Sequence, residues 1–107
     1  SSVSERSLRF EDMVDGSVRV SDADTGEEIA SLIGENDGGG FVRGVLRGMA
    51  RERAMRDIGQ TPAFTLTLWQ DGSLSLNDPA TGRSVELGAF GPDNRAAFLR
   101  FVEKGAQ

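Results

Sequence analysis

The chain has 107 residues, of which 37% are hydrophobic and 27% charged, the balance of one ordinary folded domain. It contains no histidine and no cysteine, which excludes disulfide bonds, the usual zinc sites, and catalysis by imidazole or by a thiolate nucleophile. Its net charge of −5 argues against nucleic-acid binding, because a protein that holds phosphates presents a basic surface.

Alternating apolar residues predict a three-stranded meander in the first half of the chain. The alternating positions are Leu8 and Phe10, then Val18 and Val20. This period of two is typical of strands with one buried face. Asp15-Gly16 between the two runs suits a tight hairpin, because glycine adopts a positive φ without steric cost. A second turn, from Asp22 to Gly26, leads to a third strand around Ile29.

A helix is predicted after this meander, from apolar residues spaced three and four positions apart. These residues are Phe41, Val42, Val45, Leu46 and Met49. Gly38-Gly39-Gly40 precedes them. Helix N-termini can bind phosphate, but no dinucleotide or P-loop motif follows, so a flexible connection is the favoured interpretation. Gly59, which suits a left-handed cap, and Pro62 are expected to end the helix.

Two residue types recur at every fourth position of this helix. The glycines are Gly40, Gly44 and Gly48, and the arginines are Arg43, Arg47 and Arg51. The glycine spacing permits close approach to a neighbouring element or to a partner. The arginines are expected to form a stripe roughly opposite the apolar side, either as a solvated outer face or as a docking surface for carboxylates or phosphates. From Phe41 to Arg56 the chain has five arginines and one acid, so a basic segment interrupts an acidic body.

The second half of the chain predicts the same succession of elements. The alternating apolar positions are Phe64, Leu66, Leu74 and Leu76, and the apolar positions of a second helix are Phe98, Leu99, Phe101 and Val102. Asp71-Gly72 and the segment from Asp78 to Gly82 supply the turns. The second helix is expected to begin at Pro92 and to stop at Gly105.

Trp69 is the single tryptophan and a second candidate for partner binding. Alternation places it on the strand face that carries Thr65 and Thr67, opposite Leu66 and Leu68. It therefore meets solvent or a partner, as aromatic anchors often do, or it is covered within its own domain.

The two halves also match each other residue by residue. At the offset between Asp15 and Asp71, the matched runs are Asp15-Gly16-Ser17 with Asp71-Gly72-Ser73 and Thr25-Gly26 with Thr81-Gly82. We therefore predict an α+β fold built from a duplicated βββα unit, with about six strands in antiparallel meanders packed against two helices. The predicted domain spans residues 8–105, with repeats at about 8–59 and 63–105, after an N-terminal tail at residues 1–7. Whether the strands form one sheet, two sheets or a partial barrel stays open.

Carboxylates are the catalytic and metal-binding groups that remain. The turn at residues 22–28 superficially resembles a calcium loop, but its glycine comes one residue early for an EF-hand, and Asp24 corresponds to Ala80 in the second half. No spacing among the 17 acids selects a pair of the glycosidase type. We therefore expect no catalytic residue, no metal site and no cofactor.

Taken together, these segments resemble the PuhC family of photosynthetic complex assembly proteins of purple phototrophic bacteria. The resemblance extends from Leu8 to about Val102, and its most specific part is the helix from Gly40 to Arg53, where the glycine and arginine spacings combine. The other segments are Leu8-Arg9-Phe10-Glu11-Asp12, Asp15-Gly16-Ser17-Val18, Pro62-Ala63-Phe64, Trp69, Asp71-Gly72, Asp78-Pro79-Ala80-Thr81-Gly82 and Ala89-Phe90-Gly91-Pro92.

The resemblance implies a non-catalytic factor that helps to assemble the photosynthetic reaction centre with its core light-harvesting complex through protein–protein binding. It also implies one N-terminal membrane anchor, expected to have been removed upstream of residue 1, and a soluble domain in the periplasm. The candidate partner-binding residues are Arg43, Arg47, Arg51 and Trp69. The arginines would meet acidic loops of reaction-centre and light-harvesting proteins or anionic lipid head groups. The alternatives are a generic interaction module of another envelope complex and a carboxylate-dependent hydrolase.

Overall fold

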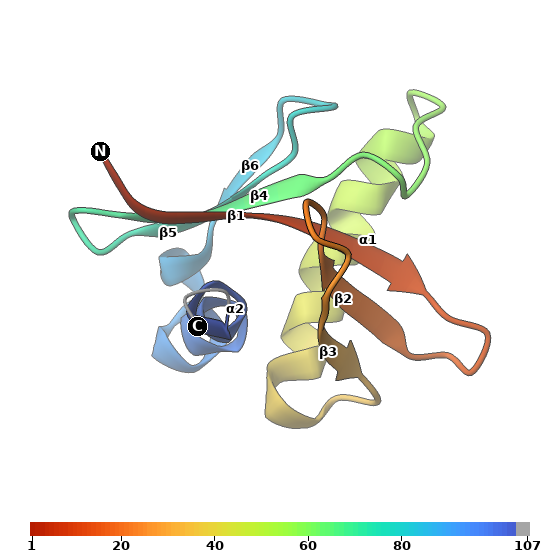
Figure 1. Ribbon diagram of the computed structural model, residues 1–107, viewed down its shortest axis with the longest axis horizontal. Helices are drawn as coiled ribbons and strands as arrows, with labels where there is room; N and C mark the ends of the chain where they lie inside the picture. Colours follow the sequence, from red (N-terminus) through yellow and green to blue (C-terminus); the bar gives the residue numbers. More distant parts are fainter. Residues whose placement is uncertain (105–107) are drawn as a thin grey trace.

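Six antiparallel strands form one sheet, in the order β3-β2-β1-β4-β5-β6 (Figure 1). The computed structural model describes residues 1–104, except for the side chains of residues 37, 103 and 104, so the predicted helix stop at Gly105 lies outside the described residues. The strands are β1 (Ser2–Asp12), β2 (Val18–Asp22), β3 (Glu28–Leu32), β4 (Phe64–Trp69), β5 (Leu74–Asn77) and β6 (Ser84–Glu86). The helices are α1 (Gly39–Ala54), α2 (Pro92–Lys104), and the short 3-10 helices η1 (Asn36–Gly38) and η2 (Leu87–Phe90). The predicted α+β class is confirmed, and the question of sheet number is answered by a single sheet.

β1 and β4 pair at the centre of the sheet and join the two halves of the chain. In this pair Leu8 lies opposite Phe64, and Arg6 lies opposite Leu66. Each half adds its second and third strands outward, so the strand order is symmetrical about the central pair. Each half therefore contributes three consecutive strands followed by one α-helix.

β1 begins at Ser2, which differs from the predicted tail at residues 1–7 because most of that segment pairs with β4. Arg6 explains the difference, since it is a charged residue at an inward-facing position. Its Nε donates to the Asp22 carboxylate at 2.9 Å, and its Nη1 donates to the Phe101 carbonyl at 3.0 Å. The alternation of apolar residues did not predict this part of β1, because Arg6 interrupts it. Alternation alone does not reveal the hydrogen-bond partners that allow Arg6 to be buried.

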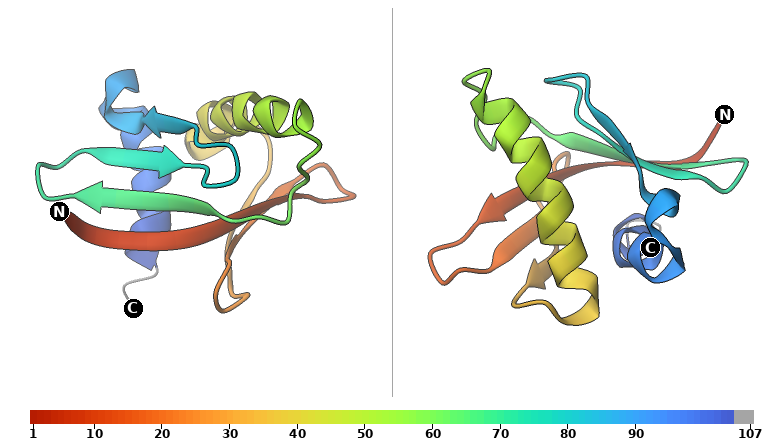
Figure 2. Two further views of the ribbon diagram at one scale, coloured as in Figure 1. Left: turned by 90° about the horizontal axis from the view of Figure 1, so that it is seen from above. Right: turned by 180° about the vertical axis from the view of Figure 1, so that it is seen from behind.

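Both helices pack against the sheet face that carries the core, and their axes lie at a steep angle to each other (Figure 2). Phe10 of β1 connects the two halves, with its ring centroid 5.6 Å from that of Phe64 and 6.4 Å from that of Phe101. Phe41 of α1 meets Phe98 of α2 edge to face at 5.8 Å. The buried apolar residues are Leu8, Phe10, Val18, Val20, Ile29, Leu32, Val42, Met49, Phe64, Leu66, Leu74, Leu76, Leu87, Ala97, Phe98, Phe101 and Val102. One core thus serves both halves.

Gly38 and Gly39, at the start of α1, pack closely against other residues, in contrast to the predicted flexible connection. Gly38 has a φ of 78°, and a Cβ added to it would lie 2.5 Å from the Cβ of Ala97 in α2. A Cβ added to Gly39 would lie 2.9 Å from the carbonyl oxygen of Gly34. Both distances are too short for a side chain, so glycine is what allows the start of α1 to approach α2.

The left-handed residue that follows α1 and closes its end is Asp57, rather than the predicted Gly59. The Asp57 amide donates to the Ala54 carbonyl at 3.2 Å, and the Ile58 amide donates to the Arg53 carbonyl at 2.9 Å. With Asp57 at a φ of 56°, these bonds form a Schellman motif. Aspartate tolerates the left-handed region better than most residues. Gly59 instead accepts a hydrogen bond from the Arg53 guanidinium at its carbonyl.

The four predicted turns form in the expected way. Positive φ values occur at Gly16 (89°), Gly26 (80°), Gly72 (87°) and Gly82 (83°). Asp15 accepts hydrogen bonds from the amide and hydroxyl of Ser17, and Asp71 accepts the same two bonds from Ser73. The local turn chemistry was therefore predictable from the sequence.

Candidate functional site

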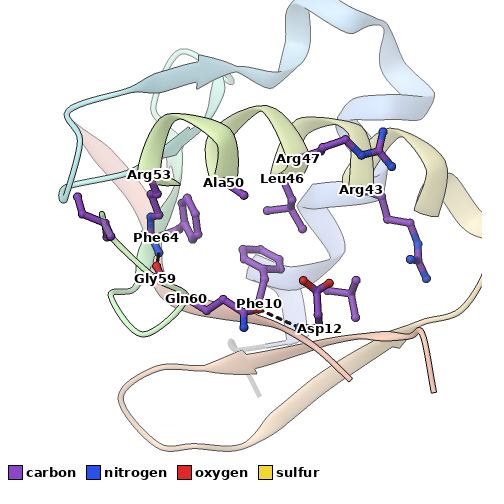
Figure 3. A pocket seen from close by; sticks show the side chains of 12 residues that line it. Phe10, Asp12, Arg43, Leu46, Arg47, Ala50, Arg53, Gly59, Gln60 and Phe64 are labelled. Carbon is purple, nitrogen blue, oxygen red and sulfur yellow. Dashed lines mark hydrogen bonds between the residues drawn. The ribbon is translucent and has the colours of Figure 1, made fainter. Parts of the chain in front are cut away.

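A groove opens between α1, the end of β1, the start of β2 and the segment that connects α1 to β4 (Figure 3). Its volume is about 380 Å³, within the range of pockets that accept a ligand or an anchoring side chain. The apolar lining residues are Phe10, Val18, Leu46, Ala50, Ile58 and Phe64. The other lining residues are Asp12, Arg43, Arg47, Arg53, Gly59 and Gln60.

Hydrogen bonds between β1 and the α1–β4 connection fix the wall opposite the helix. The Asp12 amide donates to Oε1 of Gln60 at 3.0 Å, and Nε of Arg9 donates to the Thr61 carbonyl at 2.8 Å. These bonds hold the Gln60 side chain and the backbone at Asp12 beside the groove, where Figure 3 shows both residues across from α1. The wall therefore presents a carboxylate and an amide.

Arg43 lies at the groove and is half-buried, so it is not part of a fully solvated outer face. Its Nη2 donates to the Leu32 carbonyl, and its Nη1 donates to the Gly16 carbonyl at 3.3 Å. Its Nε is buried and has no hydrogen-bond partner among the described atoms. None of the described carboxylates forms an ion pair with Arg43. The Arg43 guanidinium is therefore a positive charge held in place by two carbonyls, and its Nε–H donor has no described acceptor.

Arg47 and Arg51 are both exposed, but only Arg47 lines the groove. The α-helix has about 3.6 residues per turn, so a residue four positions further on is rotated by about 40°. The arginine stripe consequently drifts from the groove at Arg43 to the outer face at Arg51. The structure thus divides the predicted stripe into two groove residues and one residue that points elsewhere.

An ion pair between Arg53 and Asp78 lies behind the groove. Nε and Nη2 of Arg53 donate to the two carboxylate oxygens at 2.7 and 2.8 Å, and both side chains are at most 3% exposed. The guanidinium also stacks on Phe64, 4.0 Å from the ring centroid. Burial raises the pKa of the Asp78 carboxyl, but the hydrogen bonds and charge of Arg53, with the Ala80 amide, hold that pKa below its usual value of 3.8.

A second buried ion pair, Arg6–Asp22, occupies the matching turn of the first half. The hydrogen bond from Arg6, followed by those from the Thr25 and Asp24 amides, lowers the pKa of the Asp22 carboxyl. Asp22 and Asp78 both begin a turn, yet their arginines come from β1 and α1. Sequence reasoning gave both aspartates turn roles and missed the pairs, because the partners lie 16 and 25 residues away in the chain. The available signal was an aspartate placed directly after a buried strand in both halves.

Trp69 lies at the end of β4 remote from Phe64 and away from the groove. It is 38% exposed, and its Nε1 donates to Oγ of Ser75 at 2.9 Å. Ser75 pairs with Thr67, so these polar residues share the face opposite the core. The structure therefore does not bring Trp69 together with the arginines of α1.

The described part of the chain contains neither a metal-binding cluster nor a membrane-spanning helix. Among the side chains that the structure describes, no three of the metal-binding types gather closely enough to hold an ion. Among the helices of residues 1–104, none has the length and apolar character of a membrane span.

The fold and the groove define a small α+β domain with a basic-sided groove beside its first helix. A family model described as "Photosynthetic complex reorganisation protein PuhC" matches residues 3–105, so the chain belongs to this family. The family resemblance that the sequence motifs predicted is thereby confirmed. The family is named for the photosynthetic complex, which gives the chain its functional context.

A protein of Rhodobacter capsulatus, described as an uncharacterized 17.4 kDa protein in the puhA 5′ region, is similar to the chain. The two are 42% identical over 65 residues, which are 61% of this chain and 40% of the relative. The chain thus spans less than half of the length of the curated relative that it matches. No solved structure is significantly similar to the chain.

Proposed function

We propose that this chain is the partner-binding domain of a non-catalytic assembly factor for the bacterial photosynthetic reaction centre and its core light-harvesting complex. The observation that carries the proposal is the match of residues 3–105 to a family named for reorganisation of the photosynthetic complex. Direct binding to proteins of that complex is the mechanism that we infer, because assembly requires contacts that favour one arrangement of subunits over others.

The surface of the domain supports a binding role. Arg43 and Arg47 lie beside an apolar groove, and Trp69 presents part of its indole ring on another face. Arginine and tryptophan are the residue types that concentrate binding energy at protein interfaces. The two buried carboxylates, Asp22 and Asp78, are already held by arginines and backbone amides, which leaves them poorly suited to proton transfer.

The membrane location is part of the same proposal. An anchor preceding this domain would hold it at the periplasmic surface of the membrane that contains the photosynthetic complex. Arg51, which lies outside the groove, would then meet anionic lipid head groups as a secondary contact. Protease added outside spheroplasts should digest this domain in the full-length protein, whereas protection from protease until the membrane is opened would contradict the periplasmic location.

A deletion strain carrying a tagged full-length copy tests the assembly role. Without the gene, reaction-centre and core light-harvesting content should fall, and the tagged copy should restore both and retain subunits of these complexes on purification. Normal content of both complexes in the deletion strain would contradict the proposal. Retention of a different envelope complex, without photosynthetic subunits, would favour the generic interaction module.

The same motifs lead us to propose that the two βββα halves are copies of one unit. The equivalent turns support this, because the carboxylates of Asp22 and Asp78 each accept the amide two residues further on, and the amides of Gly26 and Gly82 donate to the carbonyls of these aspartates. If the halves are copies of one unit, the turn sequence of one half should fit into the other half. Replacing Pro79-Ala80 by Ala-Asp, as in the first turn, should cost no more than about 1 kcal/mol of unfolding free energy in a urea titration.

A further inference from the structure

The groove beside α1 combines apolar residues with positive charge that no described carboxylate neutralises. Phe10, Leu46 and Phe64 contribute apolar surface to the lining. Arg43 has a buried Nε without a hydrogen-bond partner in the described part of the structure. Arg47 lines the groove, is exposed, and forms no ion pair with the described side chains. The groove thus provides both a surface for an apolar group and a positive potential for an anion.

Arg43 and Arg47 have no described carboxylate partner, although carboxylates are plentiful in this chain. The arginines with an ion pair to Asp or Glu are Arg6, Arg19, Arg53, Arg56 and Arg83. The chain has 17 acids and only 12 basic residues, yet none of the described acids pairs with Arg43 or Arg47. Charge complementarity therefore favours an acidic group supplied from outside the chain.

The opposite wall favours a peptide over a lipid surface. Asp12 and Gln60 stand at the mouth of the groove, and the Asp12 carboxylate forms no ion pair within the described residues. A carboxylate and an amide can bond to the N–H and C=O groups of a peptide backbone. At the groove itself, Asp12 would instead repel an anionic membrane surface.

From this geometry we propose that the groove binds a segment of a partner protein in which an Asp or Glu side chain adjoins a large apolar side chain. The carboxylate meets Arg47 beside the fixed charge of Arg43, and the apolar side chain packs against Phe10 and Leu46. The proposal rests on the assembly role proposed above and specifies the chemistry of the partner.

Fluorescence anisotropy with three short labelled peptides tests the proposal on the folded domain. One peptide contains Glu and Leu, the second contains Lys and Leu, and the third contains Glu and Ser. The decisive variant is Arg47→Glu. Its matched control is Arg51→Glu, which makes the same charge change at an exposed position of the same helix outside the groove. Circular dichroism checks that both variants remain folded.

The expected result is saturable binding of the Glu–Leu peptide alone, weakened about tenfold or more by Arg47→Glu and unchanged by Arg51→Glu. Absence of saturable binding would overturn the proposal. Equal binding of the Lys–Leu or Glu–Ser peptide, or an equal loss in both variants, would also overturn it. So would binding to phosphatidylglycerol vesicles that depends on Arg47 while the Glu–Leu peptide does not bind.

The same variants separate this proposal from the assembly role. If Arg47→Glu restores the deletion strain fully and the Glu–Leu peptide does not bind, the groove is not the partner site and the assembly role stands. If the deletion leaves photosynthetic complexes unchanged, the assembly role fails even where the peptide binds in an Arg47-dependent way.

Discussion

At the scale of single residues, Arg53 and Asp78 form the most completely buried ion pair described in the structure. Removing two charges from water is costly, and their attraction offsets this cost only when the geometry is good and the remaining polar atoms are bonded. Here the pair is bidentate, Gly59 accepts a third hydrogen bond from Arg53, and the Ala80 amide donates to Asp78. The pair therefore fixes the end of α1 to the turn between β5 and β6.

Asp78→Ala should lower the free energy of unfolding by about 3–5 kcal/mol, because it leaves the Arg53 guanidinium buried without a counter-charge. Urea denaturation followed by circular dichroism measures the loss. The control is Asp71→Ala, which removes an exposed carboxylate that bonds only within its own turn and should cost much less. Similar losses in the two variants would show that the Arg53–Asp78 pair has no special stabilising role.

The pH dependence of this variant provides a second measurement of the same effect. The pKa of Asp78 is lower in the folded state than its usual value of 3.8, so its stabilising contribution is complete above that value. The contribution is lost as the pH falls through the lowered pKa. The difference in stability between the wild type and Asp78→Ala should therefore be constant near neutral pH and shrink only in strong acid.

At the scale of elements, α1 has an outer face that the domain leaves unused. A Cβ added to Gly44 or Gly48 would meet no other atom within 4 Å, so these glycines do not serve close packing inside the described residues. Gly38 and Gly39, by contrast, are held tightly against α2 and Gly34. Of the two explanations of the glycine spacing, internal packing is therefore excluded at Gly44 and Gly48, and approach to a partner remains.

Gly44→Ala should raise the free energy of unfolding by about 1 kcal/mol, because alanine is the better helix former and the new methyl group meets no neighbour. Gly72→Ala should lower it, since the φ of 87° at this turn strains a residue with a Cβ. Thermal unfolding of both variants tests the opposite signs. A loss of stability in Gly44→Ala would mean that the outer face of α1 is already covered.

The elements that the sequence predicted well depend on local signals. The alternation at Val18 and Val20 and the turn glycines Gly16 and Gly72 act through neighbouring residues, and these strands and turns formed as expected. The ends of β1 and α1 were less predictable. β1 reaches back to Ser2 because Arg6 finds a buried partner, and a Schellman motif with Asp57, rather than a glycine, as its left-handed residue closes the end of α1.

The groove could be anticipated only in part. The four-residue spacing identified Arg43 and Arg47, but it could not show that Arg43 bonds to backbone carbonyls while Arg47 forms no ion pair with the described side chains. The apolar lining from Phe10 and Phe64 depends on how far α1 stands from the sheet, which is a tertiary property. Trp69 was placed on the correct strand face by alternation, and its bond to Ser75 required the fold.

At the scale of the whole molecule, the two halves share their core and should unfold together. Phe10 of the first half contacts Phe64 and Phe101 of the second, and Gly38 lies against Ala97. The central β1–β4 pair joins the halves by backbone hydrogen bonds. Neither half has a separate core, so a single cooperative transition is expected for a domain of this size.

Phe101→Ala tests this cooperativity, because the fully buried ring belongs to the second half and contacts the first. It should cost about 3–5 kcal/mol. If the domain opens as one unit, hydrogen exchange should become faster by the same factor at Val20 in β2 and at Leu76 in β5, whereas Ala96→Ser, an exposed change on the same helix, should alter neither. Faster exchange confined to β5 would mean that the halves open independently. A partner bound at α1 would then stabilise only the first half, rather than the whole domain.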